Sequence, residues 1–187
     1  MTLPSILGLI VELLDAAVVP YMVTGSVASS THGVPRATLD LDVVINPDAI
    51  GIDRLVDGLR AAALYVDRGA AREALRDLGQ FNAIDATTGW KVDFLLRKDR
   101  PFSRAEFERR KQLDLLGTST WIASPEDMII VKLEWAAAID SERQLRDVAA
   151  MVDVGEGTLD TAYIDRWVAE LGLTEAWSRV RGEAAGT

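Results

Sequence analysis

Three aspartates that stand in apolar surroundings are the residues of this chain best suited to chemistry. In the segment 39–45, Asp40 and Asp42 alternate with apolar residues, and Asp93 stands within the apolar segment 90–96. Because successive side chains of a strand point to opposite faces, Asp40 and Asp42 should project from the same face. Neighbouring carboxylates repel each other at neutral pH, and a hard divalent cation such as Mg²⁺ relieves the repulsion. If the two strands are adjacent, the sequence predicts a magnesium site at Asp40, Asp42 and Asp93. A strand with one solvated face would explain Asp40 and Asp42 equally well.

Gly25 and Ser26 follow a short apolar segment and precede a helical pattern. Glycine permits a close approach of the backbone, and serine offers a hydroxyl and an amide at a helix N-terminus, where phosphates bind readily. By itself such a pair usually marks only a turn. Together with three carboxylates it predicts metal-dependent nucleotidyl transfer, in which two cations stabilise an in-line displacement and Asp93 activates the acceptor hydroxyl.

The elements that must position these residues follow from hydrophobic periodicity and from turn residues. Asn46 is expected to cap a helix with Pro47 at its first position, and Gly89 to supply the turn of a hairpin. Residues 120–122 are expected to add an edge strand. The predicted strands are 21–24, 39–45, 64–66, 81–86, 90–96 and 120–122, and the predicted helices are 4–17, one from about 27, one from 47, 70–78, 125–138 and further helices after 141.

This order of elements predicts an α/β (α+β) fold, with a mixed sheet flanked by helices and a C-terminal helical lobe. We expect a catalytic core at residues 1–122 and a helical lobe at residues 123–183, packed as a single compact unit. Ser124 is a strong capping residue for the first helix of that lobe, because a proline and two acidic residues follow it.

Composition limits the classes of function. The 187 residues carry a formal net charge of -9 and no cysteine, which argues against tight wrapping of duplex nucleic acid and excludes disulfides and thiol chemistry. No apolar segment is long enough to span a bilayer, so we expect a cytoplasmic protein without a membrane partner. The segment 97–111 is rich in Arg and Lys, which indicates a solvated helix face or, as the alternative, a phosphate-binding patch.

The Gly25 and Ser26 pair, the carboxylate pair at Asp40 and Asp42, and the third carboxylate at Asp93 together resemble the motif of the DNA polymerase beta-like nucleotidyltransferase superfamily. The segments 25–28 and 32–38 look more narrowly like small bacterial nucleotidyltransferases related to AbiEii-type toxins of abortive infection. The later segments that match this group are 124–127 leading to Lys132, and 141–147. The resemblance covers most of residues 20 to 172.

The resemblance implies that Lys132 and Asp147 line the nucleotide cleft, where Lys132 neutralises a phosphate and Asp147 orients Lys132 or the base-side pocket. Read without it, Lys132 could be a surface lysine and Asp147 an intrahelical partner of Arg143. Arg36 could grip a phosphate with its planar guanidinium or hold its loop by a salt bridge. His32 is expected to pack rather than to catalyse, because two-metal nucleotidyl transfer needs no histidine.

These observations predict a Mg²⁺-dependent nucleotidyltransferase that moves a nucleoside monophosphate from a nucleoside triphosphate to an acceptor hydroxyl and releases pyrophosphate. The toxin-like relatives imply RNA, such as the tRNA acceptor end, or a protein as the acceptor, and a cognate antitoxin as a partner. Drug-modifying relatives imply an antibiotic acceptor instead. The alternative from a different class of function is a catalytically silent module, which binds nucleotide for regulation or belongs to a toxin-antitoxin pair.

Overall fold

A seven-stranded mixed sheet forms the centre of the larger part of the chain. The structure, a computed structural model, describes residues 2–33 and 38–184. Within them the strand order is β3-β4-β5-β2-β1-β7-β6, in which β2 and β5 are parallel, β1 and β7 are parallel, and the other neighbours are antiparallel. The strands are β1 Tyr21–Thr24, β2 Asp40–Ile45, β3 Tyr65–Val66, β4 Gln80–Ile84, β5 Lys91–Leu96, β6 Lys111–Leu115 and β7 Thr118–Ile122.

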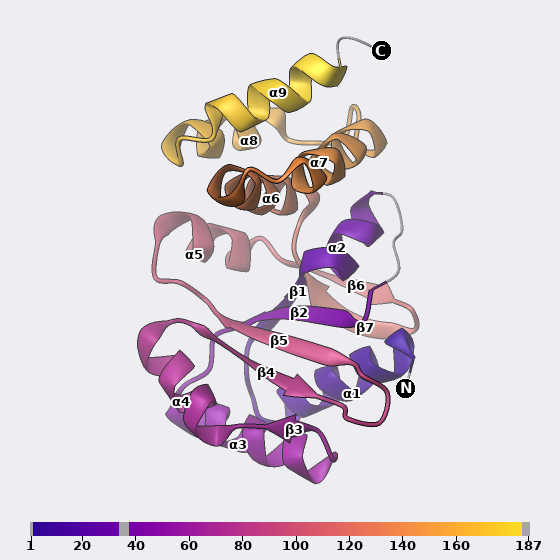
Figure 1. Cartoon of the computed structure of the whole chain (residues 1–187), viewed down its shortest axis with the longest axis vertical. Helices are drawn as coiled ribbons and strands as arrows, with labels where there is room; N and C mark the ends of the chain where they lie inside the picture. The colour runs from indigo at the N-terminus through magenta and orange to yellow at the C-terminus, as the bar shows by residue number, and fades with distance from the viewer. Residues whose placement is uncertain (1, 34–37, 185–187) are drawn as a thin grey trace. The chain divides into compact units, whose positions relative to one another are not determined.

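Helices α1 (Leu3–Ala16), α3 (Ala49–Ala61) and α4 (Arg68–Asp77) lie together on one face of this sheet (Figure 1). Alternate residues of β2, namely Leu41, Val43 and Ile45, are fully buried, as expected for side chains on the covered face of a sheet. The residues between them are more exposed. The period of two seen in the sequence therefore separates a buried apolar face of β2 from the face that carries Asp40 and Asp42.

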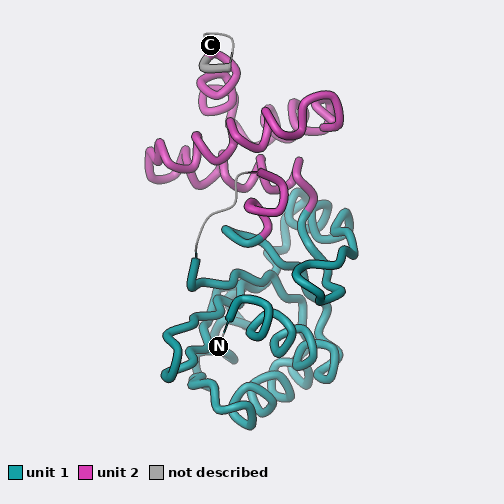
Figure 2. The backbone as a smooth tube through the Cα atoms, turned by 90° about the vertical axis from the view of Figure 1, so that its right-hand side faces the viewer, with its two compact units in different colours: residues 1–27, 37–123 teal, residues 28–36, 124–187 magenta. Residues whose placement is uncertain are grey.

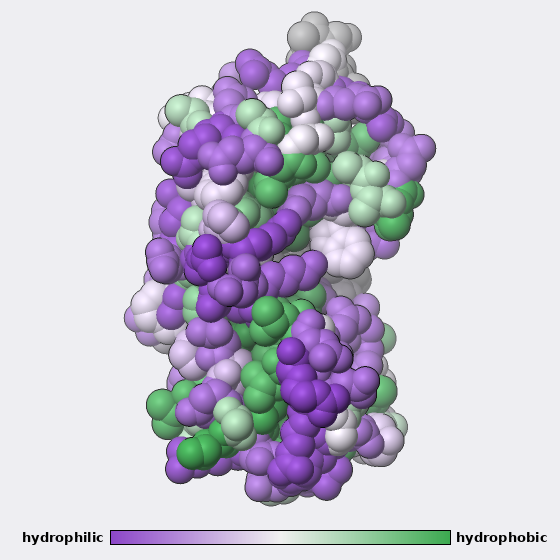
Figure 3. Space-filling model, turned by 90° about the vertical axis from the view of Figure 1, so that its left-hand side faces the viewer, coloured by the Kyte–Doolittle hydropathy of each residue, from purple (hydrophilic) through white to green (hydrophobic). Residues whose placement is uncertain are grey.

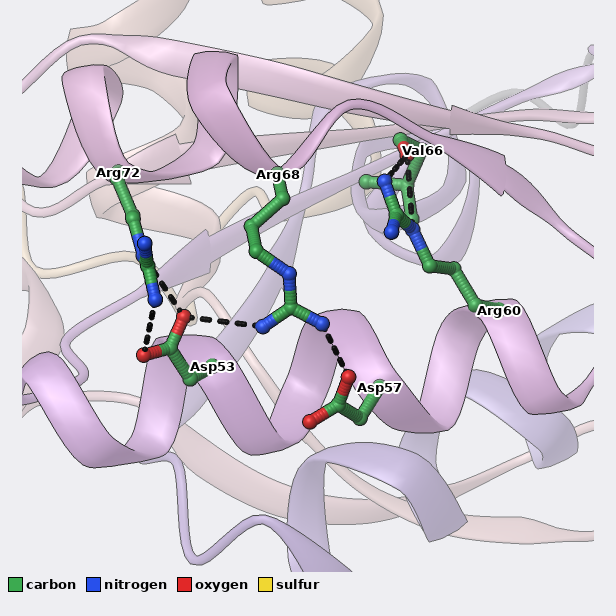
Figure 4. Close-up of polar contacts among 6 residues, drawn as sticks. All are labelled: Asp53, Asp57, Arg60, Val66, Arg68 and Arg72. Carbon is green, nitrogen blue, oxygen red and sulfur yellow. Dashed lines mark hydrogen bonds and ion pairs between the residues drawn. The ribbon is translucent and has the colours of Figure 1, made fainter.

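Arginines of α4 tie this helix to α3 (Figure 4). The Arg72 guanidinium donates two hydrogen bonds of 2.9 Å to the Asp53 carboxylate, and Arg68 donates to Asp53 at 3.2 Å and also to Asp57. Hydrogen bonding by Arg72 is the main reason that the pKa of Asp53 is lowered. Two carboxylates are thus matched by two guanidinium groups.

The chain divides into two compact units, which Figure 2 distinguishes by colour: residues 1–27 with 37–123, and residues 28–36 with 124–187. The second unit holds α6 (Pro125–Ile139), α7 (Glu142–Val154), α8 (Thr161–Glu170), α9 (Thr174–Ala184) and most of α2 (Gly25–His32). The sequence predicted a core at residues 1–122 and a lobe at residues 123–183, whereas the second unit of the structure also takes in residues 28–36. Gly33 packs directly against Met151 of α7.

A fully buried aspartate organises the start of α6. The Ser124 hydroxyl caps the helix by accepting from the Asp127 amide at 3.2 Å, as the sequence predicted. The Asp127 carboxylate accepts from the Ser124 hydroxyl and from the Tyr163 hydroxyl, both at 2.6 Å. This pair of bonds satisfies a buried charge and links α6 to α8.

Two local predictions are wrong, and one strand was not predicted. Asn46 and Pro47 do not begin α3, because Asp48 is its N-cap and accepts a hydrogen bond from the Gly51 amide at 2.6 Å. The strand at 120–122 is not an edge strand, since β7 lies between β1 and β6. Strand β6 at one edge of the sheet was not predicted, because it is short, mostly exposed and holds only two apolar residues, Leu113 and Leu115.

Hydrophilic residues cover most of the face drawn in Figure 3, and hydrophobic residues appear there as smaller patches. Of the helices in the described ranges, none is both long and apolar enough to cross a bilayer.

Candidate active site

The parallel pairing of β2 and β5 brings the predicted carboxylates together. In the register of these strands, Asp42 lies opposite Asp93 and Asp40 lies opposite Lys91. Residues that are paired in a sheet project from the same face, so these four side chains form one polar cluster. The row extends to the neighbouring strands, where Thr24 pairs with Asp42 and Asn82 pairs with Asp93. We refer to Asp40, Asp42, Asp93 and Lys91 as the carboxylate cluster.

The turn at Gly25 is fitted closely to the Asp42 side chain. Gly25 has φ +64, and a Cβ at this position would lie 1.9 Å from Asp42 Oδ2, which no side chain can occupy. The backbone amide of Ser26 donates a hydrogen bond to the Asp42 carboxylate. A glycine is therefore required here by both backbone conformation and space.

Asp42 is the carboxylate of the cluster whose charge is least compensated. Its pKa is raised above the ordinary value, first because burial disfavours the charged form and then because of the negative charge of Asp93. Asp40 raises the pKa further, whereas the Ser26 amide and Lys91 lower it. A second cation near Asp42 would relieve this unfavourable charge.

Lys91 supplies the cation that the cluster already contains. Its Nζ lies 2.8 Å from Asp93 Oδ2 and 3.8 Å from Asp40 Oδ1. The hydrogen bond with Asp93 is the main reason that the pKa of Lys91 is raised. Lys91 is not singled out in the sequence analysis, although its position two residues before Asp93 on a strand places both side chains on one face.

The donor atoms of the cluster suit magnesium in kind, because Mg²⁺ prefers carboxylate oxygens and the uncompensated charge at Asp42 favours a cation. Asp40, Asp42 and Asp93 are the residues that would hold it. In the described ranges, however, no three Asp, Glu, His or Cys side chains are already gathered as a ready set of metal ligands. The carboxylates would therefore have to rearrange around a bound ion.

Lys132 and Asp147 meet in the second unit. Lys132 Nζ on α6 donates to Asp147 Oδ2 at 2.7 Å and to Gln144 Oε1 at 3.0 Å, and both acceptors are on α7. The Lys132 side chain is only 7% exposed, so it is not the surface lysine that its helix pattern allowed. The predicted link between Lys132 and Asp147 is present in the structure.

The remaining candidates are placed as follows. Arg36 lies outside the described residues. His32 is a half-buried residue at the end of α2. The basic segment forms α5 (Pro101–Glu108) and its flanks, in which the Arg100 Nε donates to Ser103 at 2.9 Å and Arg110 stacks over the rings of Phe107 and Trp121 at 4.2 and 5.0 Å. Part of this segment therefore serves the local packing of the first unit.

The sequence matches no protein-family model and no curated protein. Nearly the whole length of the chain is similar in structure to solved proteins. It superposes on the solution structure of the antibiotic-resistance factor ANT(2'')-Ia with a TM-score of 0.62 and 13% identity, covering 98% of this chain and 97% of that one.

Two further structures give the same result. ANT(2")-Ia in complex with adenylyl-2"-tobramycin has a TM-score of 0.60 at 15% identity, over 96% of this chain and 99% of that one. An antigenic nucleotidyltransferase-like protein from Paracoccidioides brasiliensis has a TM-score of 0.55 at 18% identity, over 92% and 90% of the two chains. The predicted fold, a mixed sheet flanked by helices with a C-terminal helical lobe, is confirmed.

Proposed function

We propose that this chain is a Mg²⁺-dependent nucleotidyltransferase, which moves a nucleoside monophosphate from a nucleoside triphosphate to an acceptor hydroxyl. The observation that carries the proposal is the pairing of Asp42 with Asp93 across β2 and β5, beside the Gly25 turn, in a fold that solved nucleotidyltransferases share. A fold alone does not define an activity, so the proposal depends on the residues of the site.

We propose the following roles for the residues of the site. Asp93 accepts the proton of the acceptor hydroxyl as its oxygen attacks the α-phosphorus, and the bond from that phosphorus to the bridging oxygen of pyrophosphate breaks. Ser26 opens a helix and is suited to hold the terminal phosphates. Asp40, Asp42 and Asp93 would hold a Mg²⁺ ion, which would neutralise charge on the phosphates and on the leaving pyrophosphate.

Lys132 and Asp147 are proposed to line the nucleotide cleft, in keeping with the resemblance to the AbiEii-type group. Lys132 would contact a phosphate, and Asp147 and Gln144 would hold its ammonium in place. Arg36 is proposed as a further phosphate contact. A buried ammonium with three donors, two of which bond to Asp147 and Gln144, is suited to such a role.

For the acceptor we propose RNA such as the tRNA acceptor end, or a protein, with a cognate antitoxin as a partner. The antibiotic alternative has one supporting observation, namely that a structural neighbour was solved with a nucleotide-modified antibiotic, adenylyl-2"-tobramycin. At 15% identity this likeness concerns the fold, and it does not transfer the acceptor to this chain. The silent regulatory module is disfavoured, because clustered like charges destabilise a fold that does not use them.

The test is a transfer assay. Purified protein is incubated with Mg²⁺ and each labelled nucleoside triphosphate, in separate reactions with total tRNA, a protein lysate and a set of aminoglycosides. We expect label to be transferred to one class of acceptor and to be lost in Asp42→Asn. Asp53→Asn on α3, which makes the same chemical change at an exposed ion pair, should retain transfer. If the protein binds nucleotide but transfers label to no acceptor, and Asp42→Asn binds nucleotide equally well, the regulatory module would replace this proposal.

A further inference from the structure

Lys91 is placed so that it occupies the space between two of the proposed cation ligands. It begins β5, and its side chain projects from the same sheet face as Asp40 and Asp93. The 2.8 Å contact with Asp93 Oδ2 is a direct ion pair, and the 3.8 Å separation from Asp40 Oδ1 is at the limit of one. The ammonium therefore bridges the two carboxylates.

Lys91 compensates the negative charges of the three carboxylates unevenly. It pairs with Asp93 and Asp40, whereas Asp42 is partnered by the Ser26 amide and faces the like charges of Asp93 and Asp40. One ammonium cannot neutralise three carboxylates. Within residues 2–33 and 38–184, the cluster is thus held together by Lys91 at one side and keeps an excess of negative charge at Asp42.

Exposure shows which partner can move. The Lys91 side chain is 39% exposed and ends a flexible aliphatic stem, whereas the Asp93 side chain is 18% exposed. Lys91 can therefore turn toward water while Asp93 stays in place. Release of the ammonium would free a carboxylate oxygen of Asp93 and remove the bridge that spans to Asp40.

We propose that Lys91 is an internal counter-ion that competes with the divalent cation for Asp93 and Asp40, so that the cation binds only as the ammonium leaves. This proposal rests on the proposed function, because it assumes that the carboxylate cluster is a cation site. Lys91 is a positioning residue in this account, since it sets the arrangement of the carboxylates before an ion binds. It also lowers the affinity for the ion, which keeps the site from filling at low cation concentration.

The test compares cation binding by the ion-free full-length chain and by matched variants, with Mn²⁺ as the probe in isothermal titration calorimetry. Lys91→Met removes the ammonium and keeps the stem. It should bind Mn²⁺ about fivefold more tightly than the parent, because a partly exposed ion pair contributes about this factor. Lys91→Arg keeps the charge and should stay close to the parent. Arg54→Met, which removes an exposed positive charge from α3, should also stay close to the parent.

Thermal unfolding gives a second readout that does not depend on activity. Without the ion, Lys91→Met should melt at a lower temperature than the parent, because the carboxylates lose their counter-ion. Saturating Mn²⁺ should raise its melting temperature by more than it raises that of the parent.

These outcomes test the competition between Lys91 and the cation independently of the proposed nucleotidyltransferase activity. Equal or weaker Mn²⁺ binding by Lys91→Met, or no measurable binding by any variant, would overturn the competition, whether or not label is transferred. Tighter binding by Lys91→Met in a protein that transfers label to no acceptor would support the competition while contradicting the nucleotidyltransferase assignment.

Discussion

Two groups of carboxylates in the first unit differ in how their charge is balanced. Asp53 and Asp57 on α3 face Arg68 and Arg72 on α4, one cation for each anion (Figure 4). Among the described residues, the ammonium of Lys91 pairs with Asp93 and Asp40, and Asp42 accepts from the Ser26 amide. The first group has equal numbers of positive and negative charges, as expected of a surface that only joins two helices. The second keeps an excess of negative charge on the face of a sheet, an unfavourable arrangement that a bound cation would relieve.

The pKa shifts of the two groups have opposite directions. Hydrogen bonding by Arg72 lowers the pKa of Asp53, whereas burial and the charge of Asp93 raise that of Asp42. Perturbed pKa values occur both at structural ion pairs and at functional sites, and the direction separates the two here. Charge imbalance, more than the number of acidic residues, therefore marks the candidate site.

Asp42→Asn should lose most of its transfer activity, more than any other variant considered. Removal of a carboxylate from the proposed cation site should lower the rate of transfer at least about 10²-fold. Because the charge of Asp42 is uncompensated, the variant should nevertheless melt at a temperature no lower than the parent. The measurements are label transfer and calorimetric unfolding. A variant that transfers normally would remove Asp42 from the site.

The next effect concerns the turn against Asp42. Gly25→Ala places a Cβ at 1.9 Å from Asp42 Oδ2 and adds strain at φ +64, so the turn or the carboxylate must move. Gly89→Ala is the matched control, because Gly89 also has a positive φ, +77, but its Cβ would have no neighbour within 4 Å. The control should lose about 1–2 kcal/mol of stability and keep transfer.

Gly25→Ala should lose more stability than the control and should also lose most of its transfer activity, measured by denaturant unfolding and by the labelled assay. If the two alanine variants have the same stability and activity, the turn at Gly25 has no special relation to the cluster.

The Lys132 pair in the second unit tests whether a balanced ion pair can also be functional. Lys132 Nζ is matched by Asp147 and by the Gln144 amide oxygen, so by charge alone it resembles the α3 and α4 pairs. Asp147→Asn should destabilise the protein by about 1–3 kcal/mol, because the buried ammonium loses its counter-ion while the amide oxygen can still accept.

If Lys132 also contacts a phosphate, the KM for the nucleoside triphosphate should rise in Asp147→Asn as well. Steady-state kinetics with Asp53→Asn as the reference separates the two roles. If Asp147→Asn loses stability but its KM is unchanged, the pair of Lys132 and Asp147 has a structural role only.

The sequence predicts most of the elements that hold the site, and the reasons are local. Strand β1 has the predicted bounds because all four of its residues are buried and a glycine follows it. Ser124 caps α6 because its side chain needs only the amide of Asp127. The alternation in β2 predicts that Asp40 and Asp42 share a face, since a strand has only two faces.

What the sequence does not predict depends on pairing between distant segments. The adjacency of β2 and β5, on which the position of Asp93 depends, is formed across α3, β3, α4 and β4. Strand β6 exists because β7 offers an edge, and its own residues are mostly exposed. Lys91 was overlooked as a member of the cluster because a lysine is not a metal ligand of this kind, and its role becomes visible only beside Asp93 and Asp40.

The smallest expected effect is the pH dependence of stability, and it contrasts the two carboxylate groups directly. The pKa of Asp53 is lower in the folded protein than in the unfolded chain, so its ion pairs stabilise the fold above the unfolded pKa of about 3.9, and this contribution is lost as the pH falls through the lowered value. The pKa of Asp42 is raised, so its ionisation destabilises the fold at neutral pH, and the penalty disappears as the pH falls below the unfolded value.

Asp53→Asn should therefore be less stable than the parent at pH 7 and should approach it near pH 3, whereas Asp42→Asn should be more stable than the parent at pH 7 and should also approach it near pH 3. Urea unfolding of the three ion-free proteins at pH 7, 5 and 3 measures both differences. Asp40, Asp93, Lys91 and the Ser26 amide surround Asp42, and they are unchanged in either variant. A loss of stability in Asp42→Asn at pH 7 would mean that the cluster is balanced like the pairs of α3 and α4, and the contrast between the two groups would no longer identify the site.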